Sequence, residues 1–394
     1  MVWIKADRSS SLEYDSFFRL PKIFGLLNGV VYNDEKPSSK WSKAKNVYFW
    51  ISLMHSILVA VLELVYLAKS VEQNADFVFI MSLVPLVGHG ILAIVKLSVQ
   101  KYYHKEINSI LISLKDIYPS TLDDNITKDY SKKILYMKLF VIFYLVTLIF
   151  FNIVPFAPVL HTYFTTGVFE KTLPFFIYYW YDWRRPILYE LTFIEQIWVS
   201  TASVVANMNI DLMLCSLILQ ISMHFDVLSD RLSVLQHNDH KELTKCVERH
   251  SVLLDLCLRV ENIFSRSMLA SFLLSSVIIC LTGFQVFAQD SINKAIPYAT
   301  FLFLHMVDVY LLCYYGNLMM EKSLDVSNYA YESLWYLGNR PFQKSILIIL
   351  ERGQRAQTLT AMKFIVINLT CFKTILSTSF SYFTLLKVLN EPMD

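Results

Sequence analysis

The chain has 394 residues, of which 55% are hydrophobic, 15% aromatic and 17% charged, and its mean hydropathy is +0.43. This composition is too apolar for a soluble globular protein and predicts a membrane protein. The formal net charge of +2 gives no support to a nucleic-acid partner, since no run of Lys and Arg with interleaved aromatic residues lies outside the helix flanks.

The amino-terminal segment 1–45 carries charges throughout and has no uninterrupted apolar core. We therefore expect no cleaved secretory signal, so that the first spanning helix itself directs insertion. We predict that this segment is cytoplasmic.

Seven apolar stretches follow, each close to or above the length of about 20 residues that crosses a hydrocarbon core of roughly 30 Å. The first six, within residues 46–318, predict one transmembrane bundle. The approximate bounds of the seven are 46–68, 77–100, 134–160, 189–222, 264–288, 297–318 and 358–389.

Charge placement predicts the orientation of the bundle. With the amino terminus inside, the cytoplasmic segments carry 25 Lys and Arg residues and the outside segments carry 6, as the positive-inside rule requires. The sequence thus predicts an all-α membrane protein of seven transmembrane helices with a cytoplasmic amino terminus and an extracellular carboxyl terminus, opposite to a G-protein-coupled receptor. All six cysteines fall in spans or cytoplasmic segments, so no disulfide is expected.

Several spans are longer than the bilayer requires, and residues 189–222 would form a helix of about 50 Å. The helical pattern continues beyond the membrane in residues 223–235 and 247–263, which predicts long cytoplasmic extensions that pack together.

Near the end of the chain, Lys363 and Lys373 interrupt the last apolar run. Because a lysine in mid-bilayer is costly, we predict cytoplasmic anchor helices in residues 319–372. Residues 373–394 would then form a final membrane helix and a short outside tail.

One line along this final helix, at 100° per residue, carries hydroxyls first and aliphatic side chains later: Thr378, Ser381, Leu385 and Val388. Two interpretations stay open. The hydroxyls bond to carbonyls of the preceding turn or assist close helix packing. Alternatively, several subunits each contribute this helix to a water-filled pore that Leu385 and Leu389 close by dewetting.

In the outer half of the bundle, four spans present aromatic or small side chains at helical spacing. One interpretation is ordinary helix packing or lipid contact, and the other is an apolar pocket for a small volatile molecule. The candidates are Met81, Val84 and Gly88 in the second span, Thr147, Phe150, Phe151 and Val154 in the third, Ile197 and Thr201 in the fourth, and Tyr298 and Phe301 in the sixth.

The outside segment 172–189 and the polar residues within the spans have interpretations of their own. The aromatic outside segment 172–189 forms an interfacial belt or a lid over the pocket. Within the spans, we expect His89 to bond a neighbouring backbone group rather than a ligand. Asp211 and Asp308 are expected to pair with Lys or Arg of the lower bundle.

The stretch AYESLWYLGNRPFQKSILIILERGQRAQTLTAMKFIVINLTCFKTILSTSFSYFTLL, residues 330–386, resembles the carboxyl-terminal signature of insect odorant receptors. It contains the aromatic pair Tyr331 and Trp335, the motif LTAMKF and a final SYFTLL. The motif PILYELTFIEQIW at residues 186–198 resembles the start of the fourth span in that family. Phe380 departs from the family, which usually has Tyr there.

The resemblance implies a tetrameric, odorant-gated, non-selective cation channel of the plasma membrane, expected in sensory-neuron dendrites. In that family, a tuning subunit assembles with a shared co-receptor subunit in a heterotetramer. The co-receptor has a longer second cytoplasmic loop than residues 225–263, so this chain resembles a tuning subunit. By position, Leu385 and Leu389 would be gate residues and Val388 would face the narrow part of the pore. A volatile ligand and membrane lipid are the other expected partners, with no cofactor or metal.

Other classes of protein fit less well. No HExxH, GxSxG, CxxC or Walker motif supports an enzyme. A transporter would show inverted repeats and helices broken by Gly or Pro. A gustatory receptor is the nearest alternative because it shares the topology and the pore plan, but its usual TYxxxxxQF motif is absent. Glycan at Asn125 would support a G-protein-coupled receptor and would contradict the predicted orientation.

Overall fold

The computed structural model describes residues 12–32, 40–154, 159, 162–165, 167 and 171–390. These residues are mostly helical. The elements are α1 (Tyr14–Leu27), α2 (Lys40–Glu72), α3 (Phe77–Tyr102), α4 (His104–Asp116), α5 (Asp124–Ile153), α7 (Leu188–Ser233), α8 (His240–Ala288), α9 (Ile292–Glu332), the 3₁₀ helix η1 (Trp335–Leu337), α10 (Arg340–Gly353), β1 (Thr360–Ala361), β2 (Ile365–Val366) and α11 (Leu369–Asn390).

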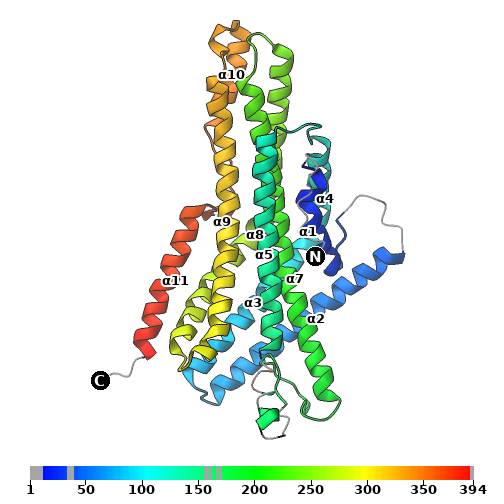
Figure 1. Ribbon diagram of the computed structural model, residues 1–394, viewed down its shortest axis with the longest axis vertical. Coiled ribbons are helices and arrows are strands. Elements are labelled where there is room, and N and C mark those ends of the chain that lie inside the picture. The colour runs from blue at the N-terminus through cyan, green and yellow to red at the C-terminus, as the bar shows by residue number, and fades with distance from the viewer. Residues whose placement is uncertain are drawn as a thin grey trace.

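Six of the described helices, α2, α3, α5, α7, α8 and α9, are long and apolar enough to cross a membrane. They correspond to the first six predicted spans. Helices α7, α8 and α9 have 46, 49 and 41 residues, or about 60 to 75 Å at 1.5 Å per residue. Because this length is about twice the thickness of a bilayer core, the three helices extend beyond it and continue as a narrow bundle toward α10 (Figure 1). The predicted all-α membrane fold with long helix extensions is confirmed.

Helix α7 is the centre of the bundle. In its most apolar stretch 83% of the residues are buried, against 28% in α2, which lies at the periphery. Helices α1, α3, α5, α8 and α9 all pack against α7. We call the end of the bundle at which α3, α7 and α9 begin the outer end, following the predicted orientation; α10 lies at the opposite end (Figure 1).

The prediction of helix throughout residues 358–372 was wrong, because β1 and β2 form an antiparallel hairpin there. Met362 and Lys363 have φ values of 52° and 62°, which close the turn and which a right-handed helix does not contain. The hydroxyl of Ser265 on α8 holds the hairpin: it donates to the carbonyl oxygen of Thr360 at 2.8 Å and accepts from the amide of Met362 at 2.6 Å. Apolar spacing could not show this contact with a distant helix.

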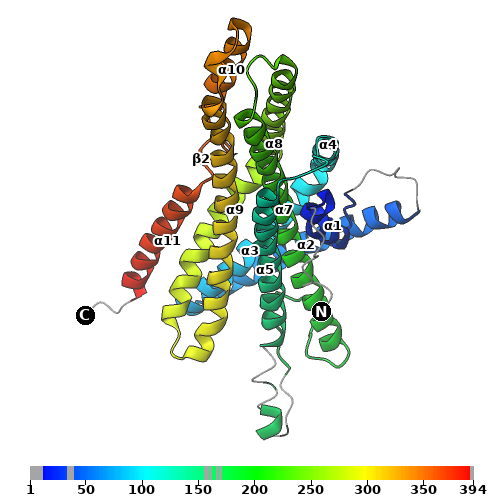
Figure 2. The same cartoon turned by 45° about the horizontal axis from the view of Figure 1, so that its top comes forward.

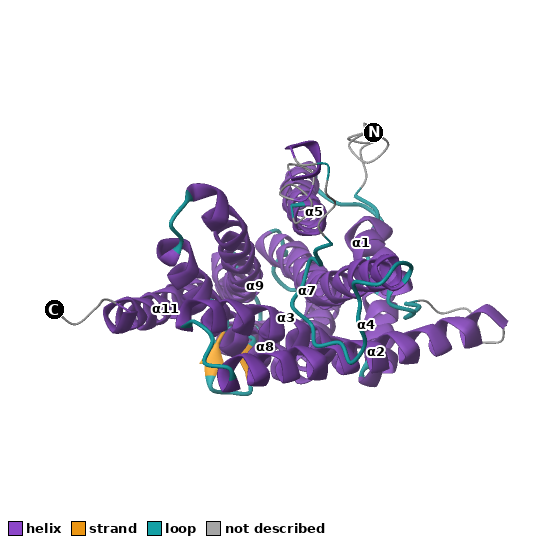
Figure 3. Cartoon of the chain, turned by 90° about the horizontal axis from the view of Figure 1, so that it is seen from below, coloured by secondary structure: helices purple, strands orange, loops and turns teal. Residues whose placement is uncertain are grey.

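Beyond the hairpin, α11 begins and packs on one side against α8 and α9. Figure 2 shows the hairpin leading from the side of α9 into α11, and Figure 3 shows α11 at the edge of the molecule. Its 22 residues give about 33 Å, enough to cross a bilayer core. Residues 391–394 of the predicted outside tail, and residues 1–11 and 33–39 of the predicted amino-terminal segment, lie outside the described residues.

Candidate functional site

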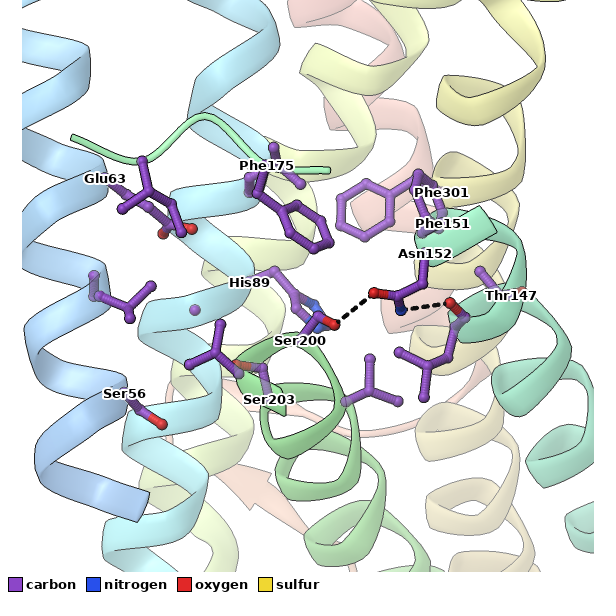
Figure 4. A pocket seen from close by; sticks show the side chains of 18 of the residues that line it. Ser56, Glu63, His89, Thr147, Phe151, Asn152, Phe175, Ser200, Ser203 and Phe301 are labelled. Atoms are coloured by element: carbon purple, nitrogen blue, oxygen red, sulfur yellow. Dashed lines mark hydrogen bonds between the residues drawn. The ribbon is translucent and has the colours of Figure 1, made fainter. Parts of the chain in front are cut away.

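A cavity with a volume of about 90 Å³ lies in the outer half of the bundle. Five helices and the loop 171–187 enclose it (Figure 4). The lining residues are Ser56, Val59, Ala60 and Glu63 of α2; Leu86, His89 and Gly90 of α3; Tyr144, Thr147, Leu148, Phe151 and Asn152 of α5; Phe175 and Ile177 of the loop; Val199, Ser200, Ser203 and Val204 of α7; and Phe301 and Leu304 of α9.

The cavity is mainly aromatic and aliphatic. Phe151 and Phe301 meet edge to face with their ring centroids 5.7 Å apart, and Phe175 enters from the loop (Figure 4). One water needs roughly 10–15 Å³ of such volume, so the space suits several waters or a compact molecule with a similar number of heavy atoms. An apolar enclosure of this kind favours a small, largely hydrophobic ligand.

Most hydroxyls and amides of the cavity bond to the protein itself. Thr147 Oγ1 donates to the carbonyl oxygen of Phe143 at 2.9 Å. Asn152 Nδ2 donates to the carbonyl oxygen of Leu148 at 2.8 Å, and Asn152 Oδ1 accepts from Ser200 Oγ at 3.1 Å (Figure 4). These bonds leave a surface with few free polar groups, which explains how a cavity with several polar residues remains mainly apolar.

His89 presents one of the free polar groups. Asn207 Nδ2 lies 3.1 Å from His89 Nε2 and also donates to the His89 carbonyl oxygen at 3.3 Å. Because the Asn207 amide nitrogen is a donor, Nε2 accepts and the proton resides on Nδ1. Nδ1 is buried without a partner among the described residues. The His89 ring was expected to bond a neighbouring backbone group, but among the described residues its partner is the side-chain amide of Asn207.

The loop 171–187 covers the cavity. Phe175 and Ile177 line the cavity, and Gln196 of α7 bonds both the amide and the carbonyl of Phe175. Tyr179 also accepts from Gln196 Nε2 at 3.1 Å and donates to Glu195 at 2.9 Å. Burial raises the pKa of Tyr179, so its hydroxyl stays protonated and available as a donor. This geometry fits the lid interpretation of the segment.

Three of the predicted ligand residues, Thr147, Phe151 and Phe301, line the cavity together. The three predicted residues of α3 are not among the lining residues, and two of them, Met81 and Gly88, face α8 instead. A Cβ added at Gly88 would lie 3.5 Å from the side chain of Ile278, and Met81 packs against a cluster that contains Phe284. Val84, one turn before Gly88, is half-buried and is not among the lining residues.

The remaining predicted positions are not among the lining residues. Phe150 contacts Phe151 edge to face. Ile197 is 36% exposed, and Thr201 Oγ1 donates to the carbonyl oxygen of Ile197. Val154 and Tyr298 are half-buried. The sequence pattern did not predict that α2 contributes to the cavity, nor that Glu63, Asn152 and Ser200 line it. For Glu63 there was a signal, because a carboxylate within a span is itself an indication of function.

Two of the predicted pore residues on α11 are strongly exposed in the single chain: Leu385 by 55% and Val388 by 66%. Ser381 is exposed as well, and its Oγ donates to the carbonyl oxygen of Ser377 at 3.0 Å. Leu389 belongs to α11, but its side chain lies outside the described part of the structure. The hydroxyl face is thus bonded to its own helix and still open to a partner.

Asp211 was expected to pair with Lys or Arg of the lower bundle. It forms an ion pair with Lys96 of the neighbouring span α3, and the two side chains are 5% and 0% exposed. Asp308 is 1% exposed, and its Oδ1 has no partner among the described residues. The partner of Asp211 is thus a lysine, as expected, but this lysine belongs to the predicted second span and not to a cytoplasmic segment, and Asp308 has no ion pair with Lys or Arg among the described residues.

The fold and the cavity define a multi-pass helical membrane protein that can enclose a small apolar molecule. The chain belongs to the odorant receptor family, since the model described as 7tm Odorant receptor matches residues 76–380. The resemblance inferred from the carboxyl-terminal motifs is therefore confirmed. The family and fold are those of receptors rather than of enzymes.

Individual relatives agree with this assignment. Putative odorant receptor 85d and Odorant receptor 67c of Drosophila melanogaster are each 25% identical over 397 residues, covering 97% of this chain and 96% and 98% of their own lengths. Both relatives bear the names of individual odorant receptors and not of a shared co-receptor, which agrees with the predicted tuning subunit. The solved structure of the insect olfactory receptor OR5 from Machilis hrabei in complex with eugenol has a TM-score of 0.81 and 16% identity, covering 96% of this chain and 100% of that chain. It shows the same fold.

Proposed function

We propose that this chain is the tuning subunit of an odorant-gated, non-selective cation channel. A volatile molecule binds in the cavity of the outer bundle, and the bound state opens a pore lined by α11. The observation that carries the proposal is the mainly apolar cavity roofed by Phe175, within a chain of the odorant receptor family. The complex of the structurally similar OR5 with eugenol supports a small organic ligand.

The exposed face of α11 supports a pore shared among subunits. Phe383 is 9% exposed and packs toward α8, whereas Leu385 and Val388 on another face are uncovered. In a heterotetramer with a co-receptor subunit, the α11 helices would surround one axis. Ser381 would then contact water near the inner side, and Leu385 and Leu389 would close the pore by dewetting.

A packed cluster between the cavity and α11 supports coupling of binding to opening. Cys280 and Phe284 of α8 pack with Phe383 of α11 and with Met81 of α3. Gln285 of α8 also donates to the carbonyl oxygen of Val78 on α3 at 2.7 Å. A ligand that binds more tightly when α3 and α8 take their open-state positions would shift the side chains that Phe383 packs against. Only such a difference in affinity between the closed and open states shifts the equilibrium between them.

The size of the cavity sets the expected affinity. For a ligand of roughly ten heavy atoms at about 0.5 to 0.8 kcal/mol each, the Kd lies between about a micromolar and hundreds of micromolar. Such a ligand dissociates quickly, which suits a sensor of changing odour concentrations at the plasma membrane of a sensory-neuron dendrite.

Whole-cell current tests the proposal. Cells express this chain with or without an odorant-receptor co-receptor, G-protein signalling is blocked, and a panel of volatiles is applied. Rapid odorant-evoked cation current only in co-expressing cells is the expected result. Current without the partner would identify a self-sufficient homomer. Silence in both, despite surface expression and a co-receptor that responds to its own agonist, would contradict the assignment for that panel.

A further inference from the structure

Among the described residues that line the cavity, Glu63 is the one carboxylic acid. It extends from α2 beneath the loop, at the level where Phe175 also enters (Figure 4). Its Oε2 lies against Gly90 of α3: a Cβ added to that glycine would be 3.4 Å from the oxygen. The carboxyl group of Glu63 therefore lies next to the backbone of α3 at the cavity wall.

The carboxyl of Glu63 has neither a hydrogen bond nor an ion pair with the described residues. Basic groups near it along α2 and α3 are engaged elsewhere. Lys96 pairs with Asp211, the ammonium of Lys69 lies 3.7 Å from the centre of the Tyr178 ring, and His55 Nε2 lies 2.8 Å from Glu195. The positive charge that would balance Glu63 is therefore not supplied by these neighbours.

The rest of the cavity cannot solvate a carboxylate well. Ser56 Oγ donates to the carbonyl oxygen of Ser52 at 2.9 Å, and Thr147 is likewise bonded to its own helix. A carboxylate removed from water is costly unless a cation or several donors surround it. The rings of Phe151, Phe175 and Phe301 add negatively polarised faces, which attract an ammonium group and not an anion.

We propose that the cavity selects small organic amines, bound as ammonium ions. The ammonium group pairs with the Glu63 carboxylate, and the hydrocarbon part packs among Phe151, Phe175 and Phe301. Alkyl ammonium groups have a pKa near that of lysine, about 10.4, so the ligand arrives as the ammonium ion. This inference rests on the proposed function because it takes the cavity as the odorant site.

Ligand-dependent thermal unfolding of the purified full chain in detergent tests the amine preference. The probes are hexylamine and hexanol, which differ only in the polar group, together with hexanoic acid. For the native chain we expect hexylamine to raise Tm at concentrations at least tenfold below those needed for hexanol, and hexanoic acid to have no effect. Equal potency of hexylamine and hexanol would overturn the proposal.

The variants then assign this preference to one carboxyl group. In Glu63→Gln we expect at least a tenfold loss of hexylamine potency with hexanol potency unchanged. Glu72→Gln, at the exposed end of the same helix, is the matched control and should behave as the native chain does. If Glu63→Gln loses both responses through misfolding, Glu63→Asp decides: retained amine preference supports the proposal, and its loss in a folded Glu63→Asp overturns it.

Currents from the same variants separate this inference from the channel assignment. Hexylamine that binds through Glu63 but evokes no current in co-expressing cells would contradict the channel function and leave the amine site intact. Alcohol-evoked current with no effect of Glu63→Gln on amines would contradict the amine site and leave the channel function intact.

Discussion

Gln196 holds the backbone of Phe175 through two hydrogen bonds of opposite direction. The Phe175 amide donates to Gln196 Oε1 at 3.0 Å, and Gln196 Nε2 donates to the Phe175 carbonyl oxygen at 3.1 Å. A side-chain amide thereby pairs with the loop much as one strand residue pairs with another. Gln196 is fully buried on α7, so these two bonds fix the backbone of Phe175 where the loop roofs the cavity.

Replacing Gln196 with Ala should loosen the roof. Both backbone groups of Phe175 lose their partner, and each buried unsatisfied group costs about 1–3 kcal/mol. We expect the Phe175 amide to exchange hydrogen at least tenfold faster and the odorant response to need about tenfold more ligand. Hydrogen exchange of the loop measures the first effect, with the exposed Gln73→Ala as a control. Unchanged exchange would show that other contacts hold the loop.

Filling the cavity from α2 should reduce the size of ligand that it accepts. Ala60 is 6% exposed and lines the cavity, so Ala60→Leu places extra carbons in the binding space at a cost of about 1–3 kcal/mol in stability. We expect long alcohols such as octanol to lose potency while butanol retains it, measured by thermal shift. Ala44→Leu, on the exposed part of the same helix, should change neither. A uniform loss for both alcohols would place their binding elsewhere.

Breaking the buried pair of Lys96 and Asp211 should destabilise the bundle. Removing one member of a buried ion pair costs about 3–5 kcal/mol because the other charge is left without a partner. We expect Lys96→Met to lower Tm strongly and the double variant with Asp211→Asn to recover part of the loss. Lys245→Met, at a pair whose side chains are 50% and 43% exposed, should cost under about 1 kcal/mol. Equal effects at the two sites would refute the buried-pair argument.

Shortening Leu385 should alter gating without unfolding the chain. The side chain is 55% exposed, so Leu385→Ala leaves little cavity in the monomer, whereas it weakens the proposed hydrophobic closure. We expect increased current without ligand in cells that also express the co-receptor, with nearly native Tm. Phe383→Ala, at a buried residue of the same helix, should lower Tm instead. Basal and evoked currents unaltered by Leu385→Ala would favour the packing interpretation of the hydroxyl face.

Much of the fold follows from local properties of the sequence. The length and apolarity of the stretches determined six spanning helices, and helical periodicity determined that α7, α8 and α9 continue beyond the membrane. The carboxyl-terminal motifs indicated the family that the comparison confirmed. These properties need no knowledge of neighbours, because each depends on residues close together in the chain.

The tertiary structure alone decided which residues enclose the cavity. Periodicity marks the faces of a helix, but it cannot say which neighbour a face meets: Thr147 lines the cavity, while Gly88 faces Ile278. Likewise, the LTAMKF segment forms a hairpin because Ser265, distant in sequence, bonds its turn. The apolar length of α2 was enough to place it in the membrane, whereas the position of Glu63 at the cavity depends on how α2, α3 and the loop pack together.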